Sequence, residues 1–333
     1  MAGAMTDRGT VLRVAPAFLL LILCRAAPAQ AQEAATGRSA PAASATASQD
    51  ALGTLRFADW LLQKGDPYRA IGEYERFRFL APSSPFDEVV RYRIALAYLV
   101  GEQYEMAGSL AARLSEDQAA DPEVREAAWL LGGRALYGLK LYPAADAHLS
   151  EFLGQERRTP LARGWAAYQL AWVRLKAWDF QASLEPLAKV PPGTPWSDAA
   201  QAMRAELSRG VTVPYRSPVV AGLLSIVPGL GHFYLGQFGT GVSAMLWNGA
   251  FGWGLYETIR AQQWGLTVLL GLFEALWYTG TIFGAVAGAH RFNRDAKLNL
   301  LDDLARRYPP PGPPPQPDLP GAPPLSLSVG ARF

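Results

Sequence analysis

The chain has 333 residues, half of them hydrophobic, which is enough for two domains that each bury a core. Its 31 lysines and arginines nearly balance 29 acidic residues, and the two kinds are interspersed. This balance excludes nucleic acid as an electrostatic partner. The single cysteine, Cys24, lies near the N-terminus. If that segment is removed, disulfides, thiol catalysis and cysteine metal sites are excluded together.

The first 31 residues have the pattern of a signal peptide. Arg8 and Arg13 precede an apolar run over 14–24, and Ala-x-Ala sequences follow at 27–29 and 29–31. We therefore expect a cleaved leader over 1–31 and export of the chain. The alternative, a lipid anchor at Cys24, requires a small residue before the cysteine, and Leu23 stands there. Residues 32–50, rich in Ala, Ser, Thr and Gln, are predicted to be a disordered linker.

Residues 51–210 carry a helix-start signal at nearly constant spacing. A residue with a side-chain oxygen precedes a proline four times, and these prolines are 37, 38 and 35 residues apart. Such a residue caps a helix, and proline suits the first helical position because its missing N–H has no partner there. The pairs are Ser84-Pro85, Asp121-Pro122, Thr159-Pro160 and Thr194-Pro195.

A second series has the same period. An aromatic residue follows a short polar break at Tyr68, Tyr104, Tyr142 and Phe180, at intervals of 36, 38 and 38 residues. Within each period apolar residues recur three and four apart, which predicts helices rather than strands. Residues 51–210 are therefore predicted to be an all-α array of about four helical hairpins with a closing helix over 197–209.

The first period resembles the tetratricopeptide repeat, in the longer form known from periplasmic members of that family. The residues that carry the resemblance are Ala58, Gly65-Asp66-Pro67-Tyr68, Ala70, Tyr74 and Pro82. It implies a right-handed superhelix whose concave groove, lined mainly by the first helix of each hairpin, binds a protein or peptide client. The groove residues it implies are Asp59, Tyr92, Trp129, Tyr168 and Arg174. The alternative to a binding role is that the three aromatic residues pack between helices and that Asp59 and Arg174 are ordinary solvated charges.

Residues 217–290 have the composition of a membrane module, since only Glu257, Arg260 and Glu274 carry a charge there. Two glycine-rich apolar runs, 241–259 and 264–289, are long enough to cross a bilayer. Their glycines suit close helix contacts within one chain or between copies in a homo-oligomer. The run over 219–227 is either part of a broken third span or a re-entrant or interfacial turn.

A glycine-rich motif interrupts this module. It resembles the signature of the small two-transmembrane-helix domain family and the Pro-Gly-x-Gly-x-x-Tyr-x-Gly motif of bacterial envelope proteins. The resemblance implies an architecture and no reaction. Its residues are Pro228, Gly229, Gly231, His232, Phe233, Tyr234 and Gly236.

Two polar residues lie within the predicted spans. Glu274 is in the middle of the last run, where a carboxylate must be neutralised, paired or turned toward other helices, and Asn248 and His232 are its candidate partners. These residues form either a proton or ion site or, as we expect, a clasp between helices.

The segment after the last span is basic. Residues 291–308 are predicted to be a juxtamembrane helix, and five cations there favour a cytoplasmic C-terminus, which requires an odd number of spans after exported repeats. Residues 309–333 are a proline-rich tail whose last nine residues alternate like a closing strand of an outer-membrane barrel. An added edge strand is the most that such an ending implies, and only in a periplasmic tail. The sequence leaves the side of this tail open.

The expected fold class is all-α: a tetratricopeptide-type superhelix followed by a small glycine-rich transmembrane module. We expect a scaffold or adaptor in the envelope of a Gram-negative bacterium, with the inner membrane favoured and the repeats in the periplasm. Its expected partners are a protein or peptide client and the lipid bilayer. The alternative is a small channel or insertion factor whose repeats recruit clients. We expect no enzymatic activity, cofactor or metal, since no catalytic or metal-binding motif is present.

Overall fold

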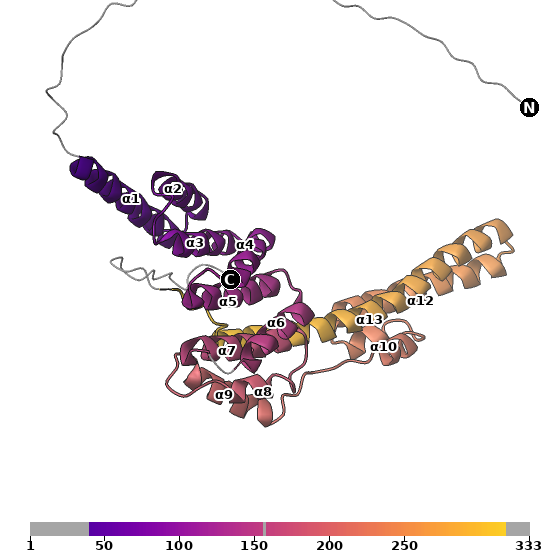
Figure 1. Ribbon diagram of the computed structural model, residues 1–333. Helices are drawn as coiled ribbons and strands as arrows, with labels where there is room; N and C mark the ends of the chain where they lie inside the picture. The colour runs from indigo at the N-terminus through magenta and orange to yellow at the C-terminus, as the bar shows by residue number, and fades with distance from the viewer. Residues whose placement is uncertain (1–39, 156–157, 318–333) are drawn as a thin grey trace, which may run out of the picture. The chain divides into compact units, whose positions relative to one another are not determined.

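The computed structural model describes residues 40–155 and 158–317, and thirteen α-helices make up this part of the chain (Figure 1). The expected leader over 1–31 and the strand-like ending over 325–333 lie outside the described residues. The chain divides into two units, Met1–Ala45 and Thr46–Phe333. Of the first unit only the beginning of helix α1 is described, so all contacts below belong to the second.

The first nine helices follow one another as antiparallel pairs, with one helix left at the end. The pairs are α1 (Ala40–Gln63) with α2 (Pro67–Leu80), α3 (Asp87–Val100) with α4 (Tyr104–Glu116), α5 (Pro122–Gly138) with α6 (Tyr142–Gly154), and α7 (Pro160–Lys176) with α8 (Leu184–Ala188); α9 is Ser197–Ser208. Helix α1 begins at Ala40, inside the stretch expected to be a linker. Its first turns are rich in alanine, which has the highest helix propensity.

Two of the four predicted helix starts are confirmed. Asp121 caps α5 by accepting a hydrogen bond from Glu123 N (2.8 Å), and Thr159 caps α7 by accepting one from Ala162 N (3.2 Å). At Ser84 and Thr194 the prediction was wrong. A turn comes first at both places, closed by hydrogen bonds from Asp87 N to the Ser84 carbonyl and from Ser197 N to the Thr194 carbonyl. The helices therefore begin at Asp87 and Ser197, two residues after the predicted prolines.

The four hairpin turns share one backbone geometry. The second residue after the end of each initial helix takes a left-handed conformation, with φ of 79° at Gly65, 60° at Glu102, 60° at Lys140 and 67° at Trp178. Around Lys140 the Leu141 N–H donates to the Leu136 carbonyl (3.1 Å), which is the long hydrogen bond of a Schellman motif. Only the first turn uses glycine, although all four need this conformation.

Replacing Lys140 with glycine should therefore stabilise the protein by about 1 kcal/mol, because glycine adopts a positive φ without the steric cost that a side chain carries. Chemical unfolding of the variant in detergent measures the difference. As a control, Arg113→Gly, the same kind of change at an exposed position inside α4, should lose about 1 kcal/mol. A destabilised Lys140→Gly variant would contradict this account of the turn.

The remaining helices form the glycine-rich module. Short helices α10 (Pro218–Leu224) and α11 (Leu230–Tyr234) precede α12 (Phe238–Arg260), which packs against the first part of α13 (Trp264–Arg307). Within the described residues only α13 is both long and apolar enough to cross a membrane. Its apolar part and α12 expose large hydrophobic side chains, including Leu276 (75% exposed) and Leu246 (68% exposed).

Helix α13 continues without a break into the segment predicted as a separate basic helix. At 1.5 Å per residue it is about 66 Å long. Its last turns lie against the repeats (Figure 1). Leu301 and Leu304 are fully buried in one cluster with Trp172 of α7 and Met203 of α9. The last turns of α13 thus cover the end of the array together with the closing helix α9.

Several basic residues of this segment have partners in the array. The Lys297 ammonium lies 5.3 Å from the ring centre of Trp178, and Arg307 forms an ion pair with Glu206 of α9. These contacts place the basic segment and the repeats on one side of any membrane that α12 and α13 cross. Helices α10 and α11, with seven and five residues, are too short to add a third span. The basic segment thus lies beside the repeats, whereas the charges alone favoured opposite sides of a membrane for the two.

Candidate functional site

The proline-rich stretch 309–317, called here the proline-rich segment, lies against the repeats. Seven of its nine residues are proline. Pro311, Pro314 and Pro317 are buried, whereas the residues between them are partly exposed. Burial of every third residue matches the three-residue period of a polyproline II helix, and the chain bends once within the stretch, at Pro313. Proline fixes φ near the value of this helix and restricts the residue before it in the same direction.

Two aromatic side chains donate hydrogen bonds to the backbone of this segment. The Trp165 indole N–H on α7 donates to the Gly312 carbonyl (3.1 Å), and the Tyr92 hydroxyl on α3 donates to the Pro315 carbonyl at the longer distance of 3.5 Å. Both rings are fully buried, and burial raises the pKa of the Tyr92 hydroxyl, which keeps it protonated as a donor. Tyr92 was predicted as a binding residue, while Trp165 was not singled out for this role.

A third hydroxyl lies on the same helix face. Tyr168 follows Trp165 by three residues, which places the two on one side of α7. Its side chain is 1% exposed, and within the described residues its hydroxyl has no hydrogen-bond partner. It packs in one cluster with Leu301, Leu304 and Tyr308, where the chain passes from α13 into the proline-rich segment. We call Tyr92, Trp165 and Tyr168 the docking face.

Alkaline pH should destabilise the fold through Tyr168. Burial raises the pKa of its hydroxyl from 10 to about 12, so its contribution to stability is complete below pH 10 and is lost between pH 10 and 12. The loss expected through this one hydroxyl at pH 11.5 is about 2 kcal/mol. Urea unfolding at pH 9 and pH 11.5 measures it as the part of the total loss that Tyr168→Phe removes. Tyr215→Phe, at a tyrosine that is 69% exposed, should leave the loss unchanged.

Asp59, another predicted groove residue, is part of a buried network. It accepts a hydrogen bond from the Tyr74 hydroxyl (2.7 Å) and forms an ion pair with Arg93. The three side chains come from α1, α2 and α3, and each is at least 93% buried. Burial, and secondarily the Asp59 carboxylate, raise the pKa of Tyr74, so this hydroxyl stays a donor. Asp59 therefore joins the first hairpin to the second and is not available to a client.

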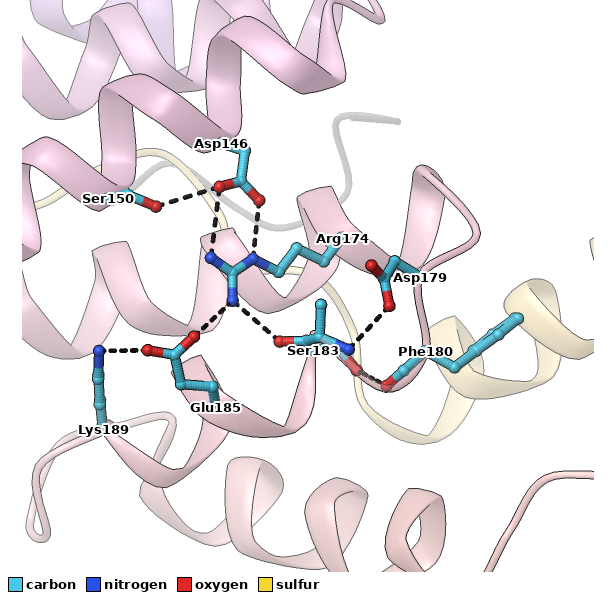
Figure 2. A network of polar contacts seen from close by, with 9 residues as sticks. Asp146, Ser150, Arg174, Asp179, Phe180, Ser183, Glu185 and Lys189 are labelled. Atoms are coloured by element: carbon cyan, nitrogen blue, oxygen red, sulfur yellow. Dashed lines mark hydrogen bonds and ion pairs between the residues drawn. The ribbon is translucent and has the colours of Figure 1, made fainter.

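Arg174 likewise joins helices (Figure 2). Its guanidinium forms a bidentate ion pair with Asp146 of α6 (2.7 and 3.3 Å). It also donates to Glu185 of α8 and to the carbonyl of Ala182, both at 2.9 Å. The hydrogen bond to Asp146 raises the pKa of Arg174. These contacts fix the short α8 against α6 and α7, which is a structural role.

Trp129 packs toward its partner helix within the third hairpin. Its ring stacks on His148 of α6 with 5.2 Å between ring centres, and its indole N–H donates to the His148 carbonyl (3.3 Å). The His148 Nε2 lies 2.8 Å from the Trp129 carbonyl. Of the five residues that the repeat resemblance implied, only Tyr92 and Tyr168 lie on the docking face.

The motif between α10 and α12 is a site of close packing. Gly229 has φ of 89°, and a Cβ at this position would collide with the Gly241 carbonyl. A Cβ on Gly231 would collide with Ser225 and the Ala221 carbonyl, and the Phe233 ring covers Gly241. Pro228 precedes Gly229 in the turn between α10 and α11.

Two further residues of the motif have structural roles. The Tyr234 hydroxyl accepts a hydrogen bond from Ser217 N (3.0 Å). Gly236, with φ of 77°, forms the turn into α12. These contacts give the motif a structural explanation.

The predicted clasp around Glu274 is not formed among the described residues. His232 Nδ1 pairs with Gln237 (3.0 Å), and Asn248 donates to the Ala244 carbonyl of its own helix (2.6 Å). One oxygen of Glu274 is buried without a hydrogen-bond partner in this part of the chain. No group of three or more His, Cys, Asp or Glu side chains is placed to hold a metal within residues 40–155 and 158–317.

These observations define the class of the molecule: an all-helical protein of paired antiparallel helices, consistent with a repeat array, that ends in a long apolar helix. Comparisons of the chain with protein-family models, with curated proteins and with solved structures find no match. The docking face and the glycine-rich module are therefore the features of the molecule that point to a function.

Proposed function

We propose that this chain is a membrane-tethered scaffold whose repeats, of the tetratricopeptide type, bind a segment of a client protein on the docking face. The observation that carries the proposal is the pair of hydrogen bonds from Trp165 and Tyr92 to backbone carbonyls of an extended segment. Side chains that donate hydrogen bonds to backbone carbonyls suit an extended ligand. Buried aromatic residues are also the usual anchors of peptide interfaces.

The tether is supported by the surface of the glycine-rich module. A soluble protein rarely exposes a continuous apolar surface of more than a few hundred Å². Here large apolar side chains are exposed along both α12 and α13, among them Leu246, Trp253, Leu272 and Leu276. A bilayer would cover them. Together with the leader-like N-terminus, this supports a protein of the cell envelope with its repeats in the periplasm and an anchor in the inner membrane.

Site-specific photo-crosslinking in intact cells tests client binding. A diazirine-bearing residue in place of Tyr92 is compared with one in place of Trp129, which packs within its own hairpin, both in the full chain carrying Pro311→Ser, Pro314→Ser and Pro317→Ser. We expect intermolecular adducts from position 92 and far fewer from position 129. Equal adducts from the two positions, or none from position 92, would contradict the proposal.

A further inference from the structure

We infer that the docking face is a receptor for proline-rich segments in the polyproline II conformation, and that the chain fills it with its own residues 309–317 in competition with clients. This inference rests on the proposed function, because it names the chemical class of the client for the same face.

The hydrogen-bonding groups of the face and of the segment are complementary. A proline-rich chain offers few backbone N–H groups, and a polyproline II helix forms no internal hydrogen bonds, so its free polar groups are carbonyl acceptors. The face supplies donors: the indole of Trp165 and the hydroxyl of Tyr92, at 3.1 and 3.5 Å from carbonyl oxygens. The Tyr168 hydroxyl, buried and unpartnered within the described chain, is a third donor on the same side of α7.

The apolar contacts have the matching period. The prolines at 311, 314 and 317 are buried at intervals of three residues, the period of a polyproline II helix, with a bend at Pro313 between the first two. Gly312, between two of these prolines, has open space where a Cβ would stand. The docking face therefore requires a proline ring at every third position of its ligand and tolerates other residues between these prolines. Aromatic donors that hold a preformed proline-rich helix are a general mode of peptide recognition, because such a ligand loses little entropy on binding.

The segment of the same chain is a competitor. It follows α13 directly, with Tyr308 as the only residue between Arg307 and Pro309. A ligand held by so short a connection has an effective concentration in the millimolar range. A client in trans must therefore displace it, and removing the chain's own segment from the face should strengthen client binding.

Binding of a labelled peptide with the sequence of residues 309–317 to the full chain in detergent micelles tests the inference, with fluorescence anisotropy as the readout. The opened chain carries Pro311→Ser, Pro314→Ser and Pro317→Ser, which keep the chain length. We expect the peptide to bind this chain at least about ten-fold more tightly than the unaltered chain. A peptide with alanine at the three buried positions should bind at least about ten-fold more weakly than the native peptide.

Two variants of the opened chain assign the binding to the docking face. Trp165→Phe and Tyr92→Phe each remove one donor and keep an aromatic ring, and each should weaken peptide binding about five-fold. Trp60→Phe, at an exposed tryptophan of α1 outside the docking face, should leave binding unchanged. Circular dichroism spectra identify any variant that fails to fold, and Tyr92→Phe, which removes a single oxygen, keeps the test valid if Trp165→Phe unfolds.

The outcomes separate the two proposals. No binding of the native peptide to the opened chain, or equal binding of the alanine peptide, would overturn the polyproline inference and show that the segment docks only as part of its own fold. Position-specific adducts in cells together with that result would leave the scaffold proposal intact with another class of client. Peptide binding without cellular adducts would support the ligand class and contradict the scaffold.

Discussion

Replacing Asp59 with alanine should lower the free energy of unfolding by about 3–5 kcal/mol. The change leaves the Arg93 guanidinium buried without its carboxylate and removes the acceptor of the Tyr74 hydroxyl. A buried guanidinium that has lost its hydration and has no carboxylate partner destabilises the folded state. Because the three residues join α1, α2 and α3, the loss should appear first at the N-terminal end of the array. Hydrogen exchange resolves this location, and chemical unfolding gives the magnitude.

The matched control for this prediction is an ion pair within one helix that is open to solvent on the side of its arginine. Glu73 lies 3.6 Å from Arg76 within α2, and their side chains are 25% and 64% exposed. Glu73→Ala should change stability by no more than about 0.5 kcal/mol, since exposed pairs of this type contribute little. Replacing Asp59 and Arg93 together with Asn and Met should recover part of the loss. An Asp59→Ala variant as stable as Glu73→Ala would contradict the buried network.

Replacing Gly229 with alanine should destabilise the glycine-rich module by about 4 kcal/mol. Two costs add at this position. The left-handed φ of 89° disfavours any side chain, and the new Cβ would collide with the Gly241 carbonyl at the start of α12. Backbone cannot move aside as the end of a flexible side chain does, so α11 and α12 would have to separate. Thermal unfolding in detergent, followed by the fluorescence of Trp247 and its neighbours, measures the effect.

Gly249→Ala is the control for this change. Gly249 lies inside α12, where an added Cβ meets nothing within 4 Å, and alanine has the higher helix propensity. We expect this variant to be unchanged or slightly more stable. If Gly229→Ala is as stable as Gly249→Ala, close packing is not the reason for the glycines of the motif.

The helical array followed from local patterns. A cap residue with a proline, and apolar residues three and four apart, determine helices within a few residues of sequence, so α5 and α7 begin where the pattern predicts. The starts at Ser84 and Thr194 were misplaced because the same residue pair also begins a turn, and the local sequence does not separate the two. The apolar composition after residue 217 likewise located α12 and α13.

The docking face did not follow from such patterns. The contact between Tyr92 and Pro315 joins residues 223 apart, and an apolar period of three in a proline-rich stretch does not reveal what it packs against. Trp165 was not singled out because a buried donor and a buried packing ring look alike in sequence. Asp59 and Arg174 were predicted to bind a client because the sequence does not reveal which charged residues form ion pairs within the fold. The packing of the basic segment on the repeats also depended on a distant contact, that of Leu304 with α7 and α9.

Cysteine-accessibility mapping tests the central claim, a repeat array and C-terminal segment that share one side of a membrane, most directly. Single cysteines replace Glu116 in α4, Asp302 near the end of α13 and Gln263 between α12 and α13, in a Cys24→Ser background; all three positions are exposed. Intact cells receive a thiol reagent that crosses only the outer membrane. We predict labelling at positions 116 and 302, and at 263 only after the inner membrane is permeabilised. Labelling of 116 and 302 from opposite sides would contradict the account.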